Sequence, residues 1–226
     1  MIEAVLWDVD DTLFDHSGAE RIAALRYFAA QGLDTDETAL RRWREITDEE
    51  YTRFTAGELT FAGQRRERVR RLLERELSDA EADAWFGRYL EVFEASWSAF
   101  PDVDGVFEVL AAPPYRHGIL SNSTTAVQER KLTMLGLRHR FEFVVCSDDL
   151  GCSKPDPRAF LQACSALGLP PEHVAYVGDR LDLDALGAQA AGLTGIWLDR
   201  TGAGASVPEG IHRITGLAQL PGVLRG

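Results

Sequence analysis

The chain has 226 residues, of which 45% are hydrophobic, and its formal net charge is -12. This length and apolar content suffice for a sizeable core and for one or two domains. The acidic excess argues against a general surface for nucleic acid polymers or anionic membranes, because both need clustered basic residues. One basic cluster occurs, and its alternation with glutamates favours a solvated helix face: Arg65, Arg66, Arg68, Arg70 and Arg71.

The cysteines and the apolar runs bear on the compartment. There are three cysteines, an odd number without zinc-like spacing, which predicts reduced thiols in a cytoplasmic protein. Glu3 and Asp8 interrupt the first apolar run, so no signal peptide is expected. No uninterrupted run of about 18 apolar residues occurs, so no transmembrane helix is expected either.

The segment AVLWDVDDTLFD, residues 4–15, carries the strongest functional signal. Residues 4–7 are apolar and predict a buried parallel strand. Asp8 and Asp10 follow, and the alternation of side chains along a strand would place both carboxylates on one face. Strand ends are where open α/β sheets bind ligands, so two carboxylates there favour a metal-assisted site with one of them as nucleophile. An ordinary acidic turn is the alternative.

Residues 16–97 show helical spacing of apolar residues and no convincing strand. Ser78 followed by Glu81 matches a capping box at the start of the last helix. Helices are predicted at 17–32, around 40–46, at 60–77 and at 78–93.

From Pro101 onwards the pattern alternates between strands and helices, which predicts a parallel sheet with helices on both faces. The fold class is therefore α/β, a Rossmann-like core formed by residues 1–15 and 98–226, with residues 16–97 inserted as a small all-helical cap domain. Strands are predicted at 117–120, 143–146, 174–177, 195–198 and near Ile214, and helices at 104–111, 125–135, 157–167 and 181–191.

Two later segments place polar residues at the same edge of the predicted sheet. Ser121 and Asn122 follow the strand at 117–120 and precede a helix, where a hydroxyl and backbone amides can bind an anion. The same residues could equally be an ordinary helix cap. Lys154 lies in SKPDP, where Pro155 and Pro157 fix the backbone, and a lysine held this way could neutralise a carboxylate and a phosphate oxygen together. An exposed loop lysine is the alternative.

The segment VGDRLDLDALG contributes further carboxylates after the strand at 174–177. Asp179 comes directly after that strand and is well placed to join Asp8 and Asp10. Mg²⁺ prefers such oxygen ligands, typically one or two carboxylates with several waters. Asp184 falls on the first helical turn, where it would hold Lys154 or waters of the metal, although acidic residues also stabilise a helix start by themselves.

In this order the four segments resemble the haloacid dehalogenase superfamily, in the subfamily with a helical cap after the first motif. DVDDT resembles its DxDxT signature at Asp8 and Asp10. Ser121 resembles its Ser/Thr after the second strand, Lys154 its lysine before proline, and GDRLDLD its GDxxxxD acidic pair. The resemblance covers the whole chain, because the position and size of the insertion also fit.

The resemblance implies roles for the two first aspartates. Asp8 would attack phosphorus and form an aspartyl phosphate, and Asp10 would protonate the leaving oxygen and then activate water. Mg²⁺ would be bound by the carboxylates of Asp8 and Asp179 and by the main-chain carbonyl of Asp10.

The remaining family positions imply substrate contacts. Ser121 and Lys154 would hold the phosphoryl oxygens with help from Asn122, and Asp184 would stand behind the metal site. The implied activity is a Mg²⁺-dependent phosphatase of small soluble phosphorylated metabolites. Nucleoside monophosphates, phosphoglycolate and sugar phosphates are the candidate substrates, and a monomer or a homodimer is expected.

Other functions stay open. A phosphomutase of the β-phosphoglucomutase type would keep the same core and would need basic residues in the cap, for which Arg53 is a candidate. A non-catalytic binding module is a further alternative, against which the intact acidic set argues. Family members that cleave carbon–halogen bonds lack an acid at the position of Asp10, so dehalogenation is disfavoured. Aromatic residues of the cap could contact a substrate or fill the core: Trp43, Tyr51 and Phe54.

Overall fold

The computed structural model of the chain describes residues 1–111, 115–203 and 206–225. The chain divides into two compact units. The first, here called the core unit, comprises Met1–Asp15 and Ser98–Gly226, and the second, here called the helical unit, comprises His16–Trp97.

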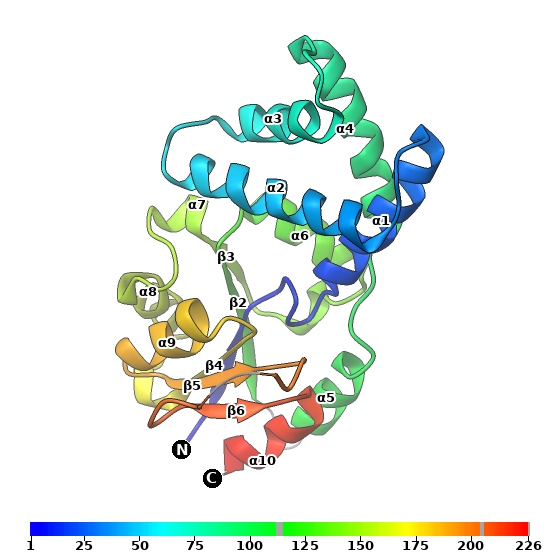
Figure 1. Cartoon of the computed structure of the whole chain (residues 1–226). Helices are drawn as coiled ribbons and strands as arrows, with labels where there is room; N and C mark the ends of the chain where they lie inside the picture. The colour runs from blue at the N-terminus through cyan, green and yellow to red at the C-terminus, as the bar shows by residue number, and fades with distance from the viewer. Residues whose placement is uncertain (112–114, 204–205, 226) are drawn as a thin grey trace. The chain divides into compact units, whose positions relative to one another are not determined.

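The core unit is built on a six-stranded parallel sheet with the strand order β3-β2-β1-β4-β5-β6 (Figure 1). This confirms the predicted α/β class. The strands are β1 (Ala4–Trp7), β2 (Arg116–Ser121), β3 (Val144–Cys146), β4 (Val174–Gly178), β5 (Thr194–Leu198) and β6 (His212–Ile214).

Helices of the core unit cover both faces of the sheet. Neighbouring residues of a strand point to opposite sides, so consecutive apolar residues need a packing partner on each face. Leu6 of β1 belongs to a buried cluster with Phe160 of α8 and Ala188 of α9. Trp7, the next residue, instead contacts Phe107 of α5, with ring centroids 5.2 Å apart. The helices are α5 (Val103–Leu110), α6 (Thr125–Met134), α7 (Ser147–Leu150), α8 (Pro157–Leu167), α9 (Leu186–Ala190) and α10 (Leu220–Arg225).

The sequence patterns located every strand of this sheet, but three details of the helices differ. The short helix α7 and the terminal helix α10 were not predicted. The helix expected over 181–191 begins with a π-helical turn at Leu181–Ala185 before α9. In that turn the Asp184 carboxylate accepts a hydrogen bond from the Arg180 amide, so a side chain binds a backbone donor at the start of the helix.

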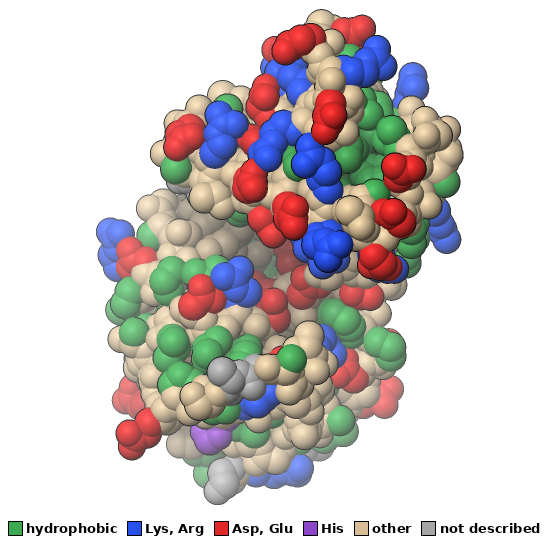
Figure 2. Space-filling view, in the orientation of Figure 1, with side chains coloured by type: hydrophobic (Ala, Val, Ile, Leu, Met, Phe, Trp, Pro, Cys, Tyr) green, Lys and Arg blue, Asp and Glu red, His purple; other side chains and the backbone are tan. Residues whose placement is uncertain are grey.

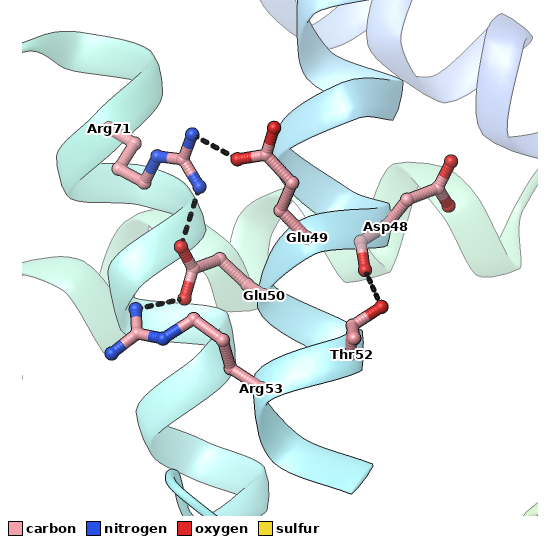
Figure 3. Close-up of a pocket in the computed structure, with 6 residues that line it drawn as sticks. All are labelled: Asp48, Glu49, Glu50, Thr52, Arg53 and Arg71. Carbon is pink, nitrogen blue, oxygen red and sulfur yellow. Dashed lines mark hydrogen bonds and ion pairs between the residues drawn. The ribbon is translucent and has the colours of Figure 1, made fainter. Parts of the chain in front are cut away.

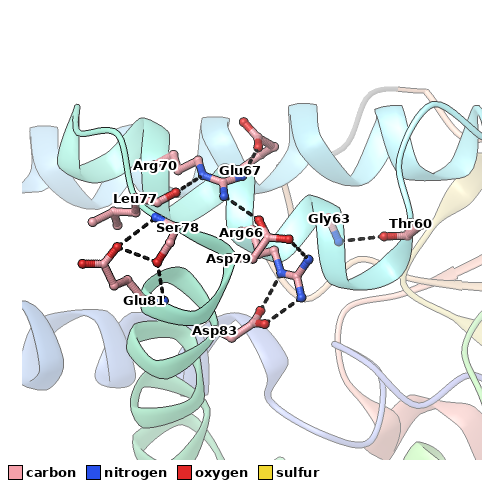
Figure 4. Close-up of polar contacts among 10 residues, drawn as sticks. All are labelled: Thr60, Gly63, Arg66, Glu67, Arg70, Leu77, Ser78, Asp79, Glu81 and Asp83. Carbon is pink, nitrogen blue, oxygen red and sulfur yellow. Dashed lines mark hydrogen bonds and ion pairs between the residues drawn. The ribbon is translucent and has the colours of Figure 1, made fainter.

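The helical unit contains α1 (His16–Gln31), α2 (Glu37–Thr55), α3 (Phe61–Leu73) and α4 (Asp79–Glu94). Its core is rich in aromatic residues, and the indole of the buried Trp43 donates a hydrogen bond to the Tyr89 hydroxyl. The predicted capping box is confirmed, since Ser78 and Glu81 exchange hydrogen bonds at the start of α4 (Figure 4).

The basic cluster of α3 is largely paired with carboxylates of neighbouring elements. Arg66 contacts Asp79 and Asp83, and Arg70 contacts Glu67 and Asp79 (Figure 4). On the face of this unit that Figure 2 shows, basic and acidic side chains accordingly lie interspersed. These arginines therefore do not present an uncompensated basic face.

Among the described residues, no helix is long and apolar enough to cross a membrane.

Candidate active site

The candidate site lies at the carboxyl ends of β1 and β4, where the strand order reverses. From β1 the chain continues to β2 and β3 on one side, and β4 begins the other side of the sheet. In open α/β sheets such a switch point is the usual place for a ligand. Asp8 follows β1 and Asp179 follows β4, so both lie at this switch point.

Asp8 and Asp10 occupy different environments. Because β1 ends at Trp7, both aspartates lie in the loop beyond the strand, and strand alternation does not set their directions. This loop is tight, since the Leu13 and Phe14 amides both donate to the Val9 carbonyl and Asp11 has a positive φ of 58°. Asp8 is buried, whereas the Asp10 side chain is 36% exposed.

Lys154 is the centre of the buried polar network. It is 4% exposed, and its Nζ donates hydrogen bonds of 2.7 Å each to Asp8 Oδ1, Asp184 Oδ1 and the Tyr176 hydroxyl. These three acceptors use all three hydrogens of the ammonium group. Burial acts to lower the pKa of Lys154, but Asp184 and Asp8 outweigh it and hold that pKa well above its usual range. Lys154 is therefore a fixed positive charge.

The backbone around Lys154 is held from two sides. The Asn122 side chain accepts a hydrogen bond from the Lys154 amide and donates one to the Lys154 carbonyl, both at 2.8 Å. On the C-terminal side, Asp156 caps α8 by accepting from the Arg158 amide, and Pro157 occupies the first turn. Asn122 thus ties the segment after β2 to the lysine segment.

Three carboxylates converge beside Lys154. One oxygen each of Asp8, Asp179 and Asp184 lies within 4.8 Å of the other two. Burial raises the pKa of Asp8 to about 7, against the opposing effect of Lys154. Burial, with repulsion from Asp8 and Asp184, raises the pKa of Asp179 to about 8. Asp8 and Asp184 are buried and Asp179 is half-buried, and such mutually repelling carboxylates form a donor set that suits a hard divalent cation such as Mg²⁺.

Within this group Asp184 is already engaged. Its Oδ1 accepts from Lys154 and its Oδ2 accepts from the Arg180 amide at 2.9 Å. Asp8 and Asp179 are therefore the better candidates for direct metal ligands, while Asp184 orients Lys154.

Asp10 and Ser121 are joined by residues of α6. Lys131 Nζ donates to Asp10 Oδ1, and Gln128 Nε2 donates both to Asp10 Oδ2 at 2.9 Å and to Ser121 Oγ at 3.1 Å. Ser121 is itself buried at the end of β2. The structure thus links these two residues through a second, separate network.

Sequence reasoning did not single out Tyr176, Gln128 or Lys131. Tyr176 lies in the apolar strand β4, and its hydroxyl also donates to the Leu120 carbonyl at 2.7 Å. A tyrosine hydroxyl in a buried strand needs a hydrogen-bond partner, so the tyrosine in this apolar run could have indicated a nearby polar group. For Gln128 and Lys131 the sequence offers only a spacing of three residues on a helix, which is common on exposed faces.

Gly178, the last residue of β4, allows the close approach of Asp184. A Cβ atom added at Gly178 would lie 2.3 Å from the Asp184 carboxylate carbon. We expect Gly178→Ala to displace Asp184 and, with it, Lys154. Because small misplacements of catalytic groups cost on the order of 100-fold in rate, we expect a loss of that size in turnover.

The matched control for this substitution is Gly105→Ala in α5, where an added Cβ would meet nothing within 4 Å. Both variants should be compared by steady-state kinetics and by urea unfolding. Equal activity of the two variants would contradict the close-approach role of Gly178.

A hollow of about 610 Å³ lies elsewhere, on α2 and α3 of the helical unit (Figure 3). Its arginines are already paired, because Arg71 contacts Glu49 and Glu50, and Arg53 contacts Glu50 and Glu58. Arg53, the candidate for a second phosphate, is thus bound to carboxylates in this structure. The hollow holds none of the core-unit groups that could perform chemistry.

The three aromatic candidates of the helical unit separate by exposure. Trp43 is buried and belongs to the core of that unit, whereas Tyr51 is 43% exposed. Phe54 lies between Tyr51 and Phe61, with ring centroids 5.8 and 5.6 Å away. Trp43 is therefore a packing residue, and Tyr51 lies partly at the surface of this unit.

The fold places a group of acidic candidate site residues at one end of a parallel sheet. The sequence matches the haloacid dehalogenase-like hydrolase family over residues 2–192, and the chain belongs to this family. This confirms the resemblance drawn from the four sequence segments. The chain is also similar to a glyceraldehyde 3-phosphate phosphatase of Methanopyrus kandleri, with 34% identity over 209 residues that cover 88% of this chain and 85% of that relative.

Solved structures agree with this assignment. The putative HAD-hydrolase YfnB of Bacillus subtilis, in a crystal form bound to magnesium, has a TM-score of 0.80 and 24% identity, covering 100% of this chain and 99% of that chain. At this identity the likeness shows the fold. A 2-haloacid dehalogenase of Pseudomonas syringae pv. Tomato DC3000 has a TM-score of 0.67 and 31% identity, covering 100% and 99% of the two chains.

Proposed function

We propose that the protein is a Mg²⁺-dependent phosphatase that hydrolyses small phosphorylated metabolites through an aspartyl phosphate. The observation that carries this proposal is the buried Lys154, bonded to Asp8 and Asp184 beside Asp179. A phosphoryl group brings negative charge to several oxygens at once, and a fixed ammonium beside a nucleophilic carboxylate can stabilise that charge. The similarity to a glyceraldehyde 3-phosphate phosphatase supports the same activity.

In this proposal Asp8 attacks phosphorus while the bond to the leaving oxygen breaks, and Asp10 gives that oxygen a proton. In the second step Asp10 takes a proton from water, which attacks the aspartyl phosphate and releases inorganic phosphate and free Asp8. The positive charge of Lys154 and the hydroxyl of Ser121 stabilise the phosphoryl oxygens, and Asn122 fixes the backbone of Lys154.

A magnesium ion held by the carboxylates of Asp8 and Asp179 and the main-chain carbonyl of Asp10 would neutralise charge on the phosphoryl oxygens. Asp184 acts behind these ligands by orienting Lys154. The core unit would perform the chemistry, and the helical unit would act as a cap that selects the substrate. Three free cysteines are consistent with a reducing cytoplasm as the compartment.

The substrate class we favour is the sugar phosphates, with a triose phosphate first among them. The alternative of a haloacid dehalogenase is suggested by the 31% identity to an enzyme of that name. Asp10 argues against a dehalogenase. An alcohol is a poor leaving group and needs an acid to protonate its oxygen, and the Asp10 carboxylate is held where it can supply that proton, whereas a halide leaves without one.

The test is phosphate release from glyceraldehyde 3-phosphate, other sugar phosphates, nucleoside monophosphates and phosphoglycolate, with Mg²⁺ or with EDTA. L-2-Chloropropionate and β-glucose 1-phosphate are added to detect halide release and isomerisation. Release of phosphate that disappears in EDTA supports the proposal, and the ranking of the panel identifies the substrate class. Halide release without phosphate release would replace the phosphatase proposal by a dehalogenase. Isomerisation without phosphate release would replace it by a mutase.

A further inference from the structure

Helix α6 directs two buried polar side chains toward Asp10. Gln128 and Lys131 are three residues apart and therefore share one face of the helix. Gln128 is 0% exposed and Lys131 is 4% exposed. Together they donate to both oxygens of the Asp10 carboxylate, Lys131 to Oδ1 and Gln128 to Oδ2. The carboxylate is thus held in one orientation.

The amide of Gln128 is oriented by what it contacts. Its NH₂ group faces the Asp10 carboxylate and the Ser121 hydroxyl. The opposite orientation would set the amide oxygen against a carboxylate, so the observed one is favoured. Its Oε1 atom is buried and has no hydrogen-bond partner among the described residues. A buried, unpaired carbonyl costs stability, so this glutamine is a poor choice for packing alone.

Lysine is rare in this chain, and its two occurrences share a feature. Of the 24 basic residues, Lys131 and Lys154 are the two lysines, and the others are arginines. Both lysines are buried, and each donates to one aspartate of the DVD segment, Lys154 to Asp8 and Lys131 to Asp10. Lys131 also lies 4.6 Å from the centroid of the Phe14 ring. A compact buried ammonium is costly unless it is paired, so both positions are defined by their carboxylates.

We propose that Gln128 and Lys131 are positioning residues that fix the Asp10 carboxylate for proton transfer to the leaving oxygen. This inference rests on the proposed phosphatase function. When Asp10 gives its proton to the leaving oxygen, the bond between phosphorus and that oxygen breaks and the carboxylate becomes negative. The ammonium of Lys131 and the amide hydrogens of Gln128 stabilise that charge from behind. In the second step the same carboxylate, in the same orientation, accepts the proton of water.

The test compares leaving groups of different quality. Protonation matters most for a poor leaving group such as an alkyl alcohol and least for p-nitrophenolate, because the latter departs readily as an anion. We expect Lys131→Met and Gln128→Leu to lower kcat/KM for the best alkyl monoester of the panel on the order of 10-fold to 100-fold more than for p-nitrophenyl phosphate. Phenyl phosphate should give an intermediate loss. A residue with only a structural role would lower all three rates by the same factor.

Controls keep the outcome unambiguous. Gln162→Leu, an exposed glutamine of α8, is the matched control and should leave the three rates in their wild-type ratio. Gln128→Leu removes an unpaired buried carbonyl together with the two hydrogen bonds that the amide donates, so urea unfolding must show that this variant is folded under the assay conditions. Wild-type turnover with an unchanged leaving-group dependence in both variants would overturn the positioning role and leave the phosphatase standing. If the wild-type protein releases no phosphate from any substrate, both the phosphatase proposal and the positioning role are overturned.

Discussion

Asp8→Asn is expected to abolish phosphate release while the protein stays folded. Loss of a covalent nucleophile typically costs at least about 10⁴-fold in kcat, and an amide cannot form the acyl phosphate. The side-chain amide oxygen of the variant can still accept the hydrogen bond from Lys154 that Asp8 accepts. Because Asp8 is a buried carboxylate near Asp179 and Asp184, its neutral replacement should leave the free energy of unfolding equal or higher.

The matched control for this substitution is Asp182→Asn. Asp182 lies in the same acidic segment as Asp184 but is exposed and pairs with Arg180. We expect wild-type turnover from this control in the same assay. Retention of full activity by Asp8→Asn would remove the aspartyl phosphate from the mechanism, whatever the control does.

Lys154→Met is expected to lose both activity and stability. Lys154 lies between Asp8 and Asp184, both of which are buried, so its removal leaves two carboxylates without their cation. Breaking a buried ion pair by removing one partner typically costs about 3–5 kcal/mol, and we expect at least about 3 kcal/mol in urea unfolding. Phosphate release should fall by on the order of 10³-fold, since the proposed function has the charge of Lys154 stabilise the phosphoryl oxygens.

A double variant separates the two losses. In Lys154→Met with Asp184→Asn, one of the two stranded charges is removed together with its partner, so part of the stability should return. Activity should not return, because the ammonium is still absent. The coupling free energy follows from the cycle of the two single variants and the double one. A double variant no more stable than Lys154→Met alone would show that the ion pair is not the source of the loss.

Much of the core unit could be predicted because buried parallel strands read as short apolar runs between helices. Asp8 and Asp179 directly follow β1 and β4, and Ser121 is the last residue of β2, so the ends of the apolar runs placed all three at one edge of the sheet. Lys154 was found for another reason, namely that Pro155 and Pro157, which follow it, restrict the backbone. The parallel arrangement of the strands brings the ends of these segments to the same edge of the sheet, and this arrangement follows from the alternation of strands and helices along the chain.

Helix α6 shows why the rest of the site could not be predicted. Its sequence is TAVQERKLTM, in which Val127 and Met134 are apolar, yet these two are 42% and 54% exposed. Gln128 and Lys131 are buried in their place. Hydrophobic periodicity assigns the inward face of a helix by apolarity, and here the inward face is set by the Asp10 carboxylate and the Ser121 hydroxyl. The partners of a buried polar residue are long-range, so its own sequence neighbourhood does not reveal them.

The pairing of both lysines with aspartates of the candidate site also determines how fast the folded protein reacts with amine-selective reagents. Acylating probes and lysine crosslinkers attack free, accessible ε-amines, and Lys131 and Lys154 are each 4% exposed and hydrogen-bonded to carboxylates. The numerous surface arginines do not react with such reagents. Side-chain acylation of the native enzyme therefore requires the site to open, and the rate of acylation measures how often that opening occurs.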